Sequence, residues 1–160
     1  MNEVVIMIGG NIGNVKEAFE KVKSQYFNTP TLLHKRSSSL YMSAPWATTS
    51  TLPFYNQAVV CTTDLLPSPL MQKLLSIESA MGRTRDTPTP DRTLDLDILY
   101  YNDWIIQHPT VIIPHPRLHL RRFCTLPLQE LLPDYIHPVL QLNNLQLNSI
   151  NEDTMWVNVA

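Results

Sequence analysis

The sequence predicts an α+β domain in which helices pack on a mostly antiparallel sheet. Two patterns indicate this class: strand-like and helical segments are mixed along the chain, and several strand-like segments are joined by tight connections. The length of 160 residues and the 44% content of hydrophobic residues fit one domain, residues 1–160, with a single sizeable core. A doubly wound fold is the alternative, because the first strand is followed by a turn and a helix.

The first expected elements are a strand and a helix joined by a glycine-rich turn. Val4–Ile8 is a continuous apolar run, which is typical of a strand buried on both faces. Residues 9–14 form the turn, which lacks the Lys-Ser/Thr pair of a phosphate-binding P-loop and is interpreted as structural. Asn14 is a good cap, and apolar residues at helical spacing predict a helix over residues 15–26.

Two strands are expected after a loop that contains Pro30. Segments 37–42 and 54–63 are the candidates, and the second is rich in the aromatic and β-branched residues that favour strands. The segment between them, residues 43–53, is a long polar loop that carries a tryptophan.

The next helix and strand have clear boundary signals. Ser68 and Pro69 start a helix well, because proline suits the first helical position, and Gly82 is a natural stop. Residues 83–91 form a polar loop. Apolar and acidic residues then alternate over residues 94–98, which predicts a half-buried strand.

Shorter elements complete the pattern. Strands are expected at residues 104–107 and 111–113, and residues 125–132 are expected to be helical. Beyond Pro138 the pattern weakens, and no element is assigned there.

Composition argues against several classes of function. Twelve Lys and Arg residues against fourteen Asp and Glu residues give a net charge of −2, which disfavours an extended surface for nucleic acid or an anionic membrane. The two cysteines and five histidines do not have zinc-finger spacing, and a disulfide framework is not expected. No signal peptide or long apolar run is visible, so we expect a soluble cytoplasmic protein.

The strongest chemical signal is a pair of carboxylates on the strand at residues 94–98. Side chains two residues apart in a strand share a face, so Asp95 and Asp97 project together. Such a pair repels itself unless a cation or proton intervenes, and Mg²⁺ is the natural partner. The alternative is a solvated polar face on an edge strand.

Three arginines lie close to this pair in the sequence. Arg83 and Arg85 lie at the start of the polar loop, and Arg92 is three residues before the first carboxylate. A divalent-metal pair beside several guanidinium groups is typical of a polyphosphate site. The alternative is that these arginines only balance the surface charges of Asp86 and Asp91.

Several aromatic residues could form a slot for a planar ring. Trp46, Phe54 and Phe123 could sandwich a heterocycle, and Asn56 could pair with its donor–acceptor edge. His115 is a candidate phosphate donor. Taken singly, an aromatic residue is more often part of the core, and a lone histidine is more often a structural residue.

A family resemblance unites these features. The chain resembles the 6-hydroxymethyl-7,8-dihydropterin pyrophosphokinase family of the folate pathway in three consecutive motifs. These motifs are Gly82-Arg-Thr-Arg85, Arg92-Thr-Leu-Asp-Leu-Asp-Ile98 and Pro114-His-Pro-Arg-Leu-His119. The likeness covers about residues 3–140. It implies a ferredoxin-like core in a three-layer αβα sandwich around a mostly antiparallel sheet. It also implies transfer of diphosphate from ATP to the hydroxymethyl group of a reduced pterin, with release of AMP.

The resemblance implies a role for each matching residue. Asp95 and Asp97 match the ligands of two Mg²⁺ ions, and Arg83 and Arg92 match catalytic contacts to the phosphates. The residues that match contacts to the co-substrate ATP are Glu78, Arg83, Arg85, Arg92, Ile98, His115 and Arg121. Those that match contacts to the pterin are Ser43, Ala44, Trp46, Phe54, Asn56 and Phe123. The expected partners are these two small molecules only, with no nucleic acid or membrane, and the chain is expected to be a monomer.

The polar loop departs from the family pattern. The family usually has Trp-Gly-Pro just before the arginine at position 92, where this chain has Thr89-Pro90-Asp91. The tryptophan that covers the pterin is therefore missing, or is replaced by Trp46. Asp91 is expected to add a negative charge beside the phosphates.

The hypothesis for the reaction is in-line attack of the pterin hydroxyl on the β-phosphorus of MgATP. Such transfers depend on positioning and charge neutralisation, for which the acidic pair and the arginines suffice. Two alternatives remain: a metal-dependent phosphohydrolase that uses the same carboxylates, and a non-catalytic homologue that binds a pterin or nucleotide.

Overall fold

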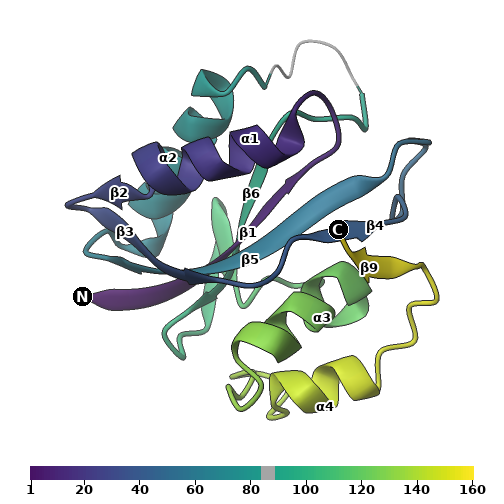
Figure 1. Cartoon of the computed structure of the whole chain (residues 1–160). Coiled ribbons are helices and arrows are strands. Elements are labelled where there is room, and N and C mark those ends of the chain that lie inside the picture. Colours follow the sequence, from purple (N-terminus) through teal and green to yellow (C-terminus); the bar gives the residue numbers. More distant parts are fainter. Residues whose placement is uncertain (84–88) are drawn as a thin grey trace.

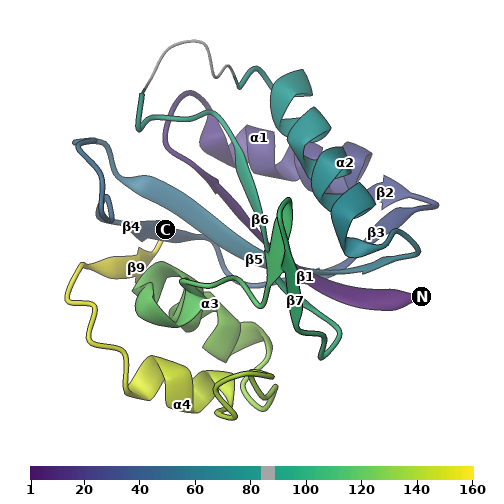
Figure 2. The same ribbon diagram turned by 180° about the vertical axis from the view of Figure 1, so that it is seen from behind.

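The computed structural model describes residues 1–83 and 89–160, and it places a seven-stranded antiparallel sheet between two pairs of helices (Figures 1 and 2). The strands of the sheet are β1 (Asn2–Gly10), β2 (Asn28–Thr29), β3 (Leu32–Ser37), β4 (Tyr41–Ser43), β5 (Phe54–Thr63), β6 (Asp95–Tyr101) and β9 (Val157–Val159). The α-helices are α1 (Val15–Lys21), α2 (Pro67–Ala80), α3 (Arg122–Leu131) and α4 (Asn144–Ser149). A separate hairpin consists of β7 (Ile106–His108) and β8 (Val111–Ile113), and two shorter helical turns are η1 (Val22–Tyr26) and η2 (Leu118–Leu120).

Every strand pair in the sheet is antiparallel. The order is β2-β3-β5-β1-β6, while β4 pairs with the beginning of β5 and β9 pairs with β4. The α+β prediction with a mostly antiparallel sheet is therefore confirmed. The doubly wound alternative is wrong, because that fold requires parallel neighbours joined by helical crossovers.

Strand β1 is the centre of both hydrophobic cores. Alternate residues project to opposite faces, so Val4, Ile6 and Ile8 pack in the core beside α1 and α2, while Val5 and Met7 pack in the core beside α3 and α4. The prediction of a strand buried on both faces is confirmed. Full burial of each such side chain contributes roughly 1.5–3 kcal/mol.

The predicted turn at residues 9–14 begins too early. Gly9 and Gly10 are still in β1, because both pair with β5 and Gly9 also pairs with β6. A Cβ atom on Gly10 would lie 2.7 Å from the carbonyl oxygen of Thr93. Glycine at this position is therefore required by the close approach of a neighbouring backbone and not by a turn.

The strand predicted over residues 37–42 is two strands. Ser38 interrupts the ladder: its hydroxyl oxygen accepts from the amide of Ala58, and its own amide donates to the Ala58 carbonyl. Gln57 donates its side-chain amide to the Ser38 carbonyl at 2.9 Å. These contacts separate β3 from β4 along β5, and the segment around Pro30 that was expected to be a loop contains β2 and the start of β3.

The helices agree with the sequence patterns except at their ends. The helix expected over residues 15–26 consists of α1 followed by the π-helical turn η1. Helix α2 begins at Pro67, one residue before Ser68, and α3 begins three residues before Thr125. In the described part of the chain, no helix is both long enough and apolar enough to cross a membrane.

The final elements, α4 and β9, were not expected from the sequence. Helix α4 has six residues and β9 has three, which is too short for a hydrophobic period to be recognised. Tertiary contacts hold them: β9 pairs with β4, and Asn144 at the start of α4 is fully buried against the sheet.

The first prediction concerns the anchor of α4. The hydroxyl of buried Tyr100 donates to Asn144 Oδ1 at 2.8 Å, and Asn144 Nδ2 donates to the Leu132 carbonyl at 2.8 Å. Asn144→Ala should lower the free energy of unfolding by about 1–3 kcal/mol, because buried polar groups lose their partner. Urea denaturation measures this change. Tyr100→Phe should cost less in the Asn144→Ala background than in the unmodified protein, and strictly additive losses would contradict the interpretation.

Candidate active site

A pocket of about 230 Å³ opens where β1 ends and β5 begins. Its lining includes Met7, which belongs to the core beside α3 and α4, so the pocket lies on that face of the sheet. The polar lining residues come from β5, β6, the loop after β4 and the segment before α3. Segments far apart in the sequence therefore meet at one end of the sheet.

The floor of the pocket is a row of residues on three adjacent strands. Gly9 on β1 pairs with Asn56 on β5 and with Asp95 on β6. A Cβ atom on Gly9 would lie 3.3 Å from Asn56 Oδ1 and 3.9 Å from the Cβ of Asp95. The glycine therefore leaves open floor between an amide on one side and a carboxylate on the other.

The acidic end of the pocket contains both predicted carboxylates. Asp95 and Asp97 line it together with Arg92, so the predicted shared face of the strand is confirmed. Burial, followed by the neighbouring charge of Asp95, raises the pKa of Asp97 to about 7. Strand β6 is at the end of the sheet order, but Asp97 is partly buried beside Asp95, which does not fit the alternative of a freely solvated edge.

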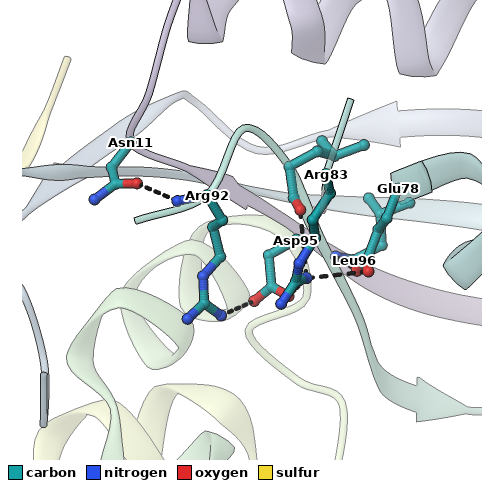
Figure 3. Close-up of polar contacts among 7 residues, drawn as sticks. Asn11, Glu78, Arg83, Arg92, Asp95 and Leu96 are labelled. Atoms are coloured by element: carbon teal, nitrogen blue, oxygen red, sulfur yellow. Dashed lines mark hydrogen bonds and ion pairs between the residues drawn. The ribbon is translucent and has the colours of Figure 1, made fainter. Parts of the chain in front are cut away.

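Two arginines hold Asp95 from different directions (Figure 3). Arg83 Nη1 donates to Asp95 Oδ1 at 2.7 Å, and Arg92 Nη1 donates to Asp95 Oδ2 at 3.4 Å. Arg83 also donates to Glu78 Oε2 at 3.0 Å, and Glu78 Oε1 accepts from the amide of Leu96 at 2.8 Å. Glu78 is buried, so it anchors Arg83 from behind. Neither Glu78 nor Arg83, which was predicted to contact the phosphates, is among the residues that line the pocket.

The acidic pair fits a divalent cation. Among the described residues, no group of three or more His, Cys, Asp or Glu side chains could hold a metal ion. Mg²⁺ does not need such a cage, because it usually takes one or two carboxylates and completes its shell with water and substrate phosphates. The raised pKa of Asp97 shows that negative charge is unfavourable there, and a bound cation would relieve that cost.

The aromatic end of the pocket contains three predicted side chains, Trp46, Phe54 and Phe123. The guanidinium carbon of Arg121 lies 4.9 Å from the centre of the Trp46 ring and 5.5 Å from that of Phe123. These are cation–π distances. Arg121 therefore joins two walls of the predicted slot while it also lines the pocket.

Two arginine side chains carry donors that have no partner. Nε of Arg92 and Nε of Arg121 are buried without a hydrogen bond to any described residue. Buried donors of this kind are rare in folded proteins and usually have a ligand or water as partner. Both residues line the pocket, so their guanidinium groups give it positive charge that suits an anion.

Asn56 is oriented from behind by Ser43. The Nδ2 group of Asn56 donates to Ser43 Oγ at 3.0 Å, and both side chains are buried. Ser43 and Ala44 thus lie behind the pocket wall and are not among its lining residues. Their predicted role at the pterin edge is supported only indirectly, through the amide that Ser43 holds.

The structure does not bring the remaining predicted residues into this pocket. The side chain of Ile98 is buried in the opposite core beside α1 and α2. His115 lines a neighbouring cavity of about 160 Å³, where burial and the charge of Arg121 lower its pKa to about 4. His115 Nδ1 accepts from the amide of Arg117, so the neutral ring keeps Nε2 as its donor. Arg85 lies outside the described residues.

Sequence reasoning missed Asn11, which positions Arg92. Asn11 Oδ1 accepts from the backbone amide of Arg92 at 2.8 Å (Figure 3). The backbone amide of Asn11 donates in return to the Arg92 carbonyl at 3.0 Å. The turn containing Asn11 was interpreted as structural only, and no sequence spacing links it to residue 92. Arg117, which lines the pocket, was also missed, although it stands in the Pro114-His-Pro-Arg motif.

Asp91 is held by two loops and is not among the residues that line the pocket. Its carboxylate accepts from Asn11 Nδ2 at 2.8 Å and from the hydroxyl of Ser50. Asp91 therefore connects the end of β1 to the loop at residues 44–53, and its effect on bound phosphates stays a prediction. Trp46, from the same loop, reaches the aromatic end of the pocket.

Comparison with known proteins gives a consistent family. A model of the family described as 7,8-dihydro-6-hydroxymethylpterin-pyrophosphokinase (HPPK) matches residues 5–133. The chain is 34% identical over 134 residues to a 2-amino-4-hydroxy-6-hydroxymethyldihydropteridine pyrophosphokinase of Synechocystis, covering 84% of this chain and 68% of that protein. It is 32% identical over 143 residues to the protein of the same name in Aquifex aeolicus, covering 87% and 86% respectively.

Other similar proteins are longer. The folic acid synthesis protein FOL1 of Dictyostelium discoideum is 35% identical over 156 residues, but these cover 94% of this chain and only 23% of that protein. A crystal structure of Plasmodium falciparum HPPK-DHPS with pteroate superimposes with a TM-score of 0.76 at 16% identity, covering 92% of this chain and 44% of that one. The structural likeness shows that the fold is shared.

The second prediction concerns stability and pH. Because the pKa of Asp97 rises from 3.8 to about 7 on folding, the folded protein binds this proton more tightly than the unfolded chain. In metal-free protein the contribution of Asp97 to the free energy of unfolding should therefore fall as pH rises from about 4 to 7, and Asp97→Asn should remove a pH-dependent loss of at least ~1.4 kcal/mol, the value of one pKa unit. Chemical denaturation across the pH range measures it. Asp134→Asn, at an exposed carboxylate, is the matched control, and equal pH slopes with and without Asp97 would refute the assignment.

Proposed function

The chain belongs to the 7,8-dihydro-6-hydroxymethylpterin-pyrophosphokinase family, and we propose that it transfers diphosphate from MgATP to the hydroxymethyl group of 6-hydroxymethyl-7,8-dihydropterin, with release of AMP. Two relatives are named pyrophosphokinases and a third is named a folic acid synthesis protein, which supports an ATP-dependent diphosphotransferase of folate biosynthesis. The proposal includes the residues that contact each substrate, the two Mg²⁺ ions and a monomeric assembly.

One observation carries the proposal: the row of Asn56, Gly9 and Asp95 across three strands. It places an amide and an aromatic slot beside a carboxylate pair and arginines, within one pocket. A transfer between a heterocyclic alcohol and a nucleotide needs these two environments next to each other, because its rate depends on holding both reactants in line.

At the heterocycle end, the pterin ring would lie between the aromatic side chains. Trp46, Phe54 and Phe123 offer ring faces, and Asn56 offers an amide edge whose orientation is fixed by Ser43. An amide pairs well with the adjacent donors and acceptors of a pterin. This arrangement supports recognition by stacking and by one directed polar contact.

At the phosphate end, Arg92 and Arg121, which both line the pocket, would bind the ATP tail through their guanidinium groups. Arg83, held by both Glu78 and Asp95, would keep the carboxylate of Asp95 in place. The 3.4 Å contact between Arg92 and Asp95 is longer than the 2.7 Å contact of Arg83, so Arg92 is the arginine more easily redirected to substrate.

In the proposed reaction, the pterin hydroxyl oxygen attacks the β-phosphorus and forms the new P–O bond. The bond from the β-phosphorus to the oxygen that bridges to the α-phosphorus breaks, AMP leaves with that electron pair, and the hydroxyl proton passes to solvent. Arg92 and Arg121 stabilise the charge that develops on the transferred and leaving oxygens. Two Mg²⁺ ions, held by Asp95 and Asp97, would neutralise phosphate charge and lower the pKa of the attacking hydroxyl.

The connectivity of the sheet also supports the ferredoxin-like assignment. The chain runs β1-α1-β3-β5-α2-β6, and the spatial order of these strands is β3-β5-β1-β6. Two split βαβ units of this kind define the ferredoxin-like pattern. The helices α3 and α4 on the opposite face would supply the third layer of the sandwich.

The direct test of the function is AMP release. MgATP with 6-hydroxymethyl-7,8-dihydropterin should give one AMP for each pyrophosphorylated pterin, and MgATP alone should give almost none. Hydrolysis of ATP without pterin would instead indicate a phosphohydrolase, and tight binding without AMP would indicate a non-catalytic homologue. Gel filtration of the same preparation tests the proposed monomer.

The third prediction concerns the metal ligands. Asp97→Ala should reduce turnover by more than ~100-fold, because losing a direct ligand should exceed the ~10–100-fold cost of losing an outer-shell partner. Steady-state AMP formation at saturating Mg²⁺ measures the loss, and circular dichroism checks that the fold is retained. Asp134→Ala is the control, and a turnover near that of the unmodified chain would contradict the metal assignment.

The fourth prediction separates chemistry from binding at Arg92. Arg92→Ala should lower kcat by ~10²–10³-fold, the usual cost of removing a preorganised charge donor. Single-turnover measurements at saturating ATP give this number directly. A change confined to the KM for ATP would assign Arg92 to ground-state binding alone.

A further inference from the structure

The last ten residues of this sequence lie outside the family match, which covers residues 5–133. We refer to residues 151–160 as the closing segment. It follows α4, passes the beginning of α3 and ends in β9, which lies beside β4 (Figures 1 and 2). It contacts α3, which carries Phe123, and β4, which leads into the loop that carries Trp46.

The first set of contacts caps α3. The amide of Arg122, the first residue of α3, donates to Asp153 Oδ2 at 3.0 Å, although the preceding residue offers no side-chain cap of its own. Asn151 adds bonds from its amide group to the His119 carbonyl and to Thr125 Oγ1. A carboxylate at a helix start satisfies a free amide and complements the helix dipole.

This cap fixes a wall of the pocket, because Arg121 and Phe123 flank the capped residue. Both line the pocket, and Arg121 is placed over the Phe123 ring. A loosened first turn of α3 would therefore displace the ring and the guanidinium together.

The second set of contacts holds the opposite wall. Strand β9 pairs with β4 in a register that places Val157 opposite Ser43, and the amide of Ala44 donates to the Trp156 carbonyl at 3.0 Å. Strand β4 has only three residues and leads directly into the loop that carries Trp46. Pairing on both sides, with β5 and with β9, fixes the base of that loop.

The two walls meet at Arg121, whose guanidinium lies over both Trp46 and Phe123. One continuous segment therefore fastens both sides of the aromatic slot. The phosphate end is held by other contacts: Asn11 fixes the backbone of Arg92, and Glu78 anchors Arg83.

We propose that the closing segment is a positioning element that sets the affinity of the slot for the pterin, with a smaller effect on ATP, which Arg92 also binds in the proposed function. This inference rests on the proposed function. It assigns to residues outside the family match a role in substrate recognition that they perform without touching the substrate.

The test compares kinetic constants of point variants in the full chain. Asp153→Ala should raise the KM for the pterin about fivefold, the factor that corresponds to one lost helix cap, and should raise the KM for ATP by a smaller factor, because Arg92 keeps its place when Arg121 is displaced. Asp153→Asn should recover most of the loss, because its amide oxygen can still accept from the Arg122 amide. Glu152→Ala removes an equal charge from the neighbouring exposed position and should leave both constants unchanged.

A second variant addresses the β4 side. Deletion of residues 156–160 removes β9 but keeps Asp153, and it should also raise the KM for the pterin more than that for ATP. Equal changes in both KM values, or a lower Tm with no change in the KM for the pterin, would overturn the proposal. Asp153→Ala keeps the test valid if the deletion variant does not fold.

Fluorescence titration of the pterin onto the same proteins gives a readout that needs no turnover. If the unmodified chain binds pterin but releases no AMP, the proposed function fails. About fivefold weaker binding by Asp153→Ala would still support the positioning role, and unchanged binding would refute it.

Discussion

The pairing register of β5, β1 and β6 is the constraint on which the site depends. It sets Asn56, Gly9 and Asp95 side by side on the face that α3 and α4 cover. Because side chains alternate in a strand, a slip of one residue would send the carboxylates into the opposite core and bring apolar residues into the pocket. The alternation of β6 opposes that slip, since Leu96 and Ile98 are buried in the core beside α1 and α2 while Asp95 and Asp97 line the pocket on the other face.

The two neighbouring carboxylates on β6 lower the stability of the folded protein. Asp97 is partly buried beside another carboxylate, and its pKa is raised accordingly. The arginines contact Asp95, so Asp97 has the less compensated charge. Proteins commonly retain such unfavourable groups where a ligand later compensates them, at the expense of stability in the empty state. The same reasoning explains why the pocket also holds arginine donors without partners.

The loops around the pocket are connected by polar side chains that the motif alone does not reveal. Asn11 contacts both Arg92 and Asp91, and Asp91 accepts from Ser50 in the loop that carries Trp46. This cluster links the phosphate end to the heterocycle end from outside the pocket. The closing segment forms a similar link on the opposite side, between the start of α3 and β4.

The sequence by itself determined the fold class, the strands Val4–Ile8 and Phe54–Thr63, and the acidic face of β6, because these follow from local periodicity. The family motifs added the arginines and the aromatic residues. Only the tertiary structure decided that Asn11 positions Arg92 and that Ile98 faces away from the pocket. It alone also formed α4 and β9, whose short sequences carry no period of their own. The physical reason is that these features depend on contacts between segments far apart in the chain, which local spacing cannot encode.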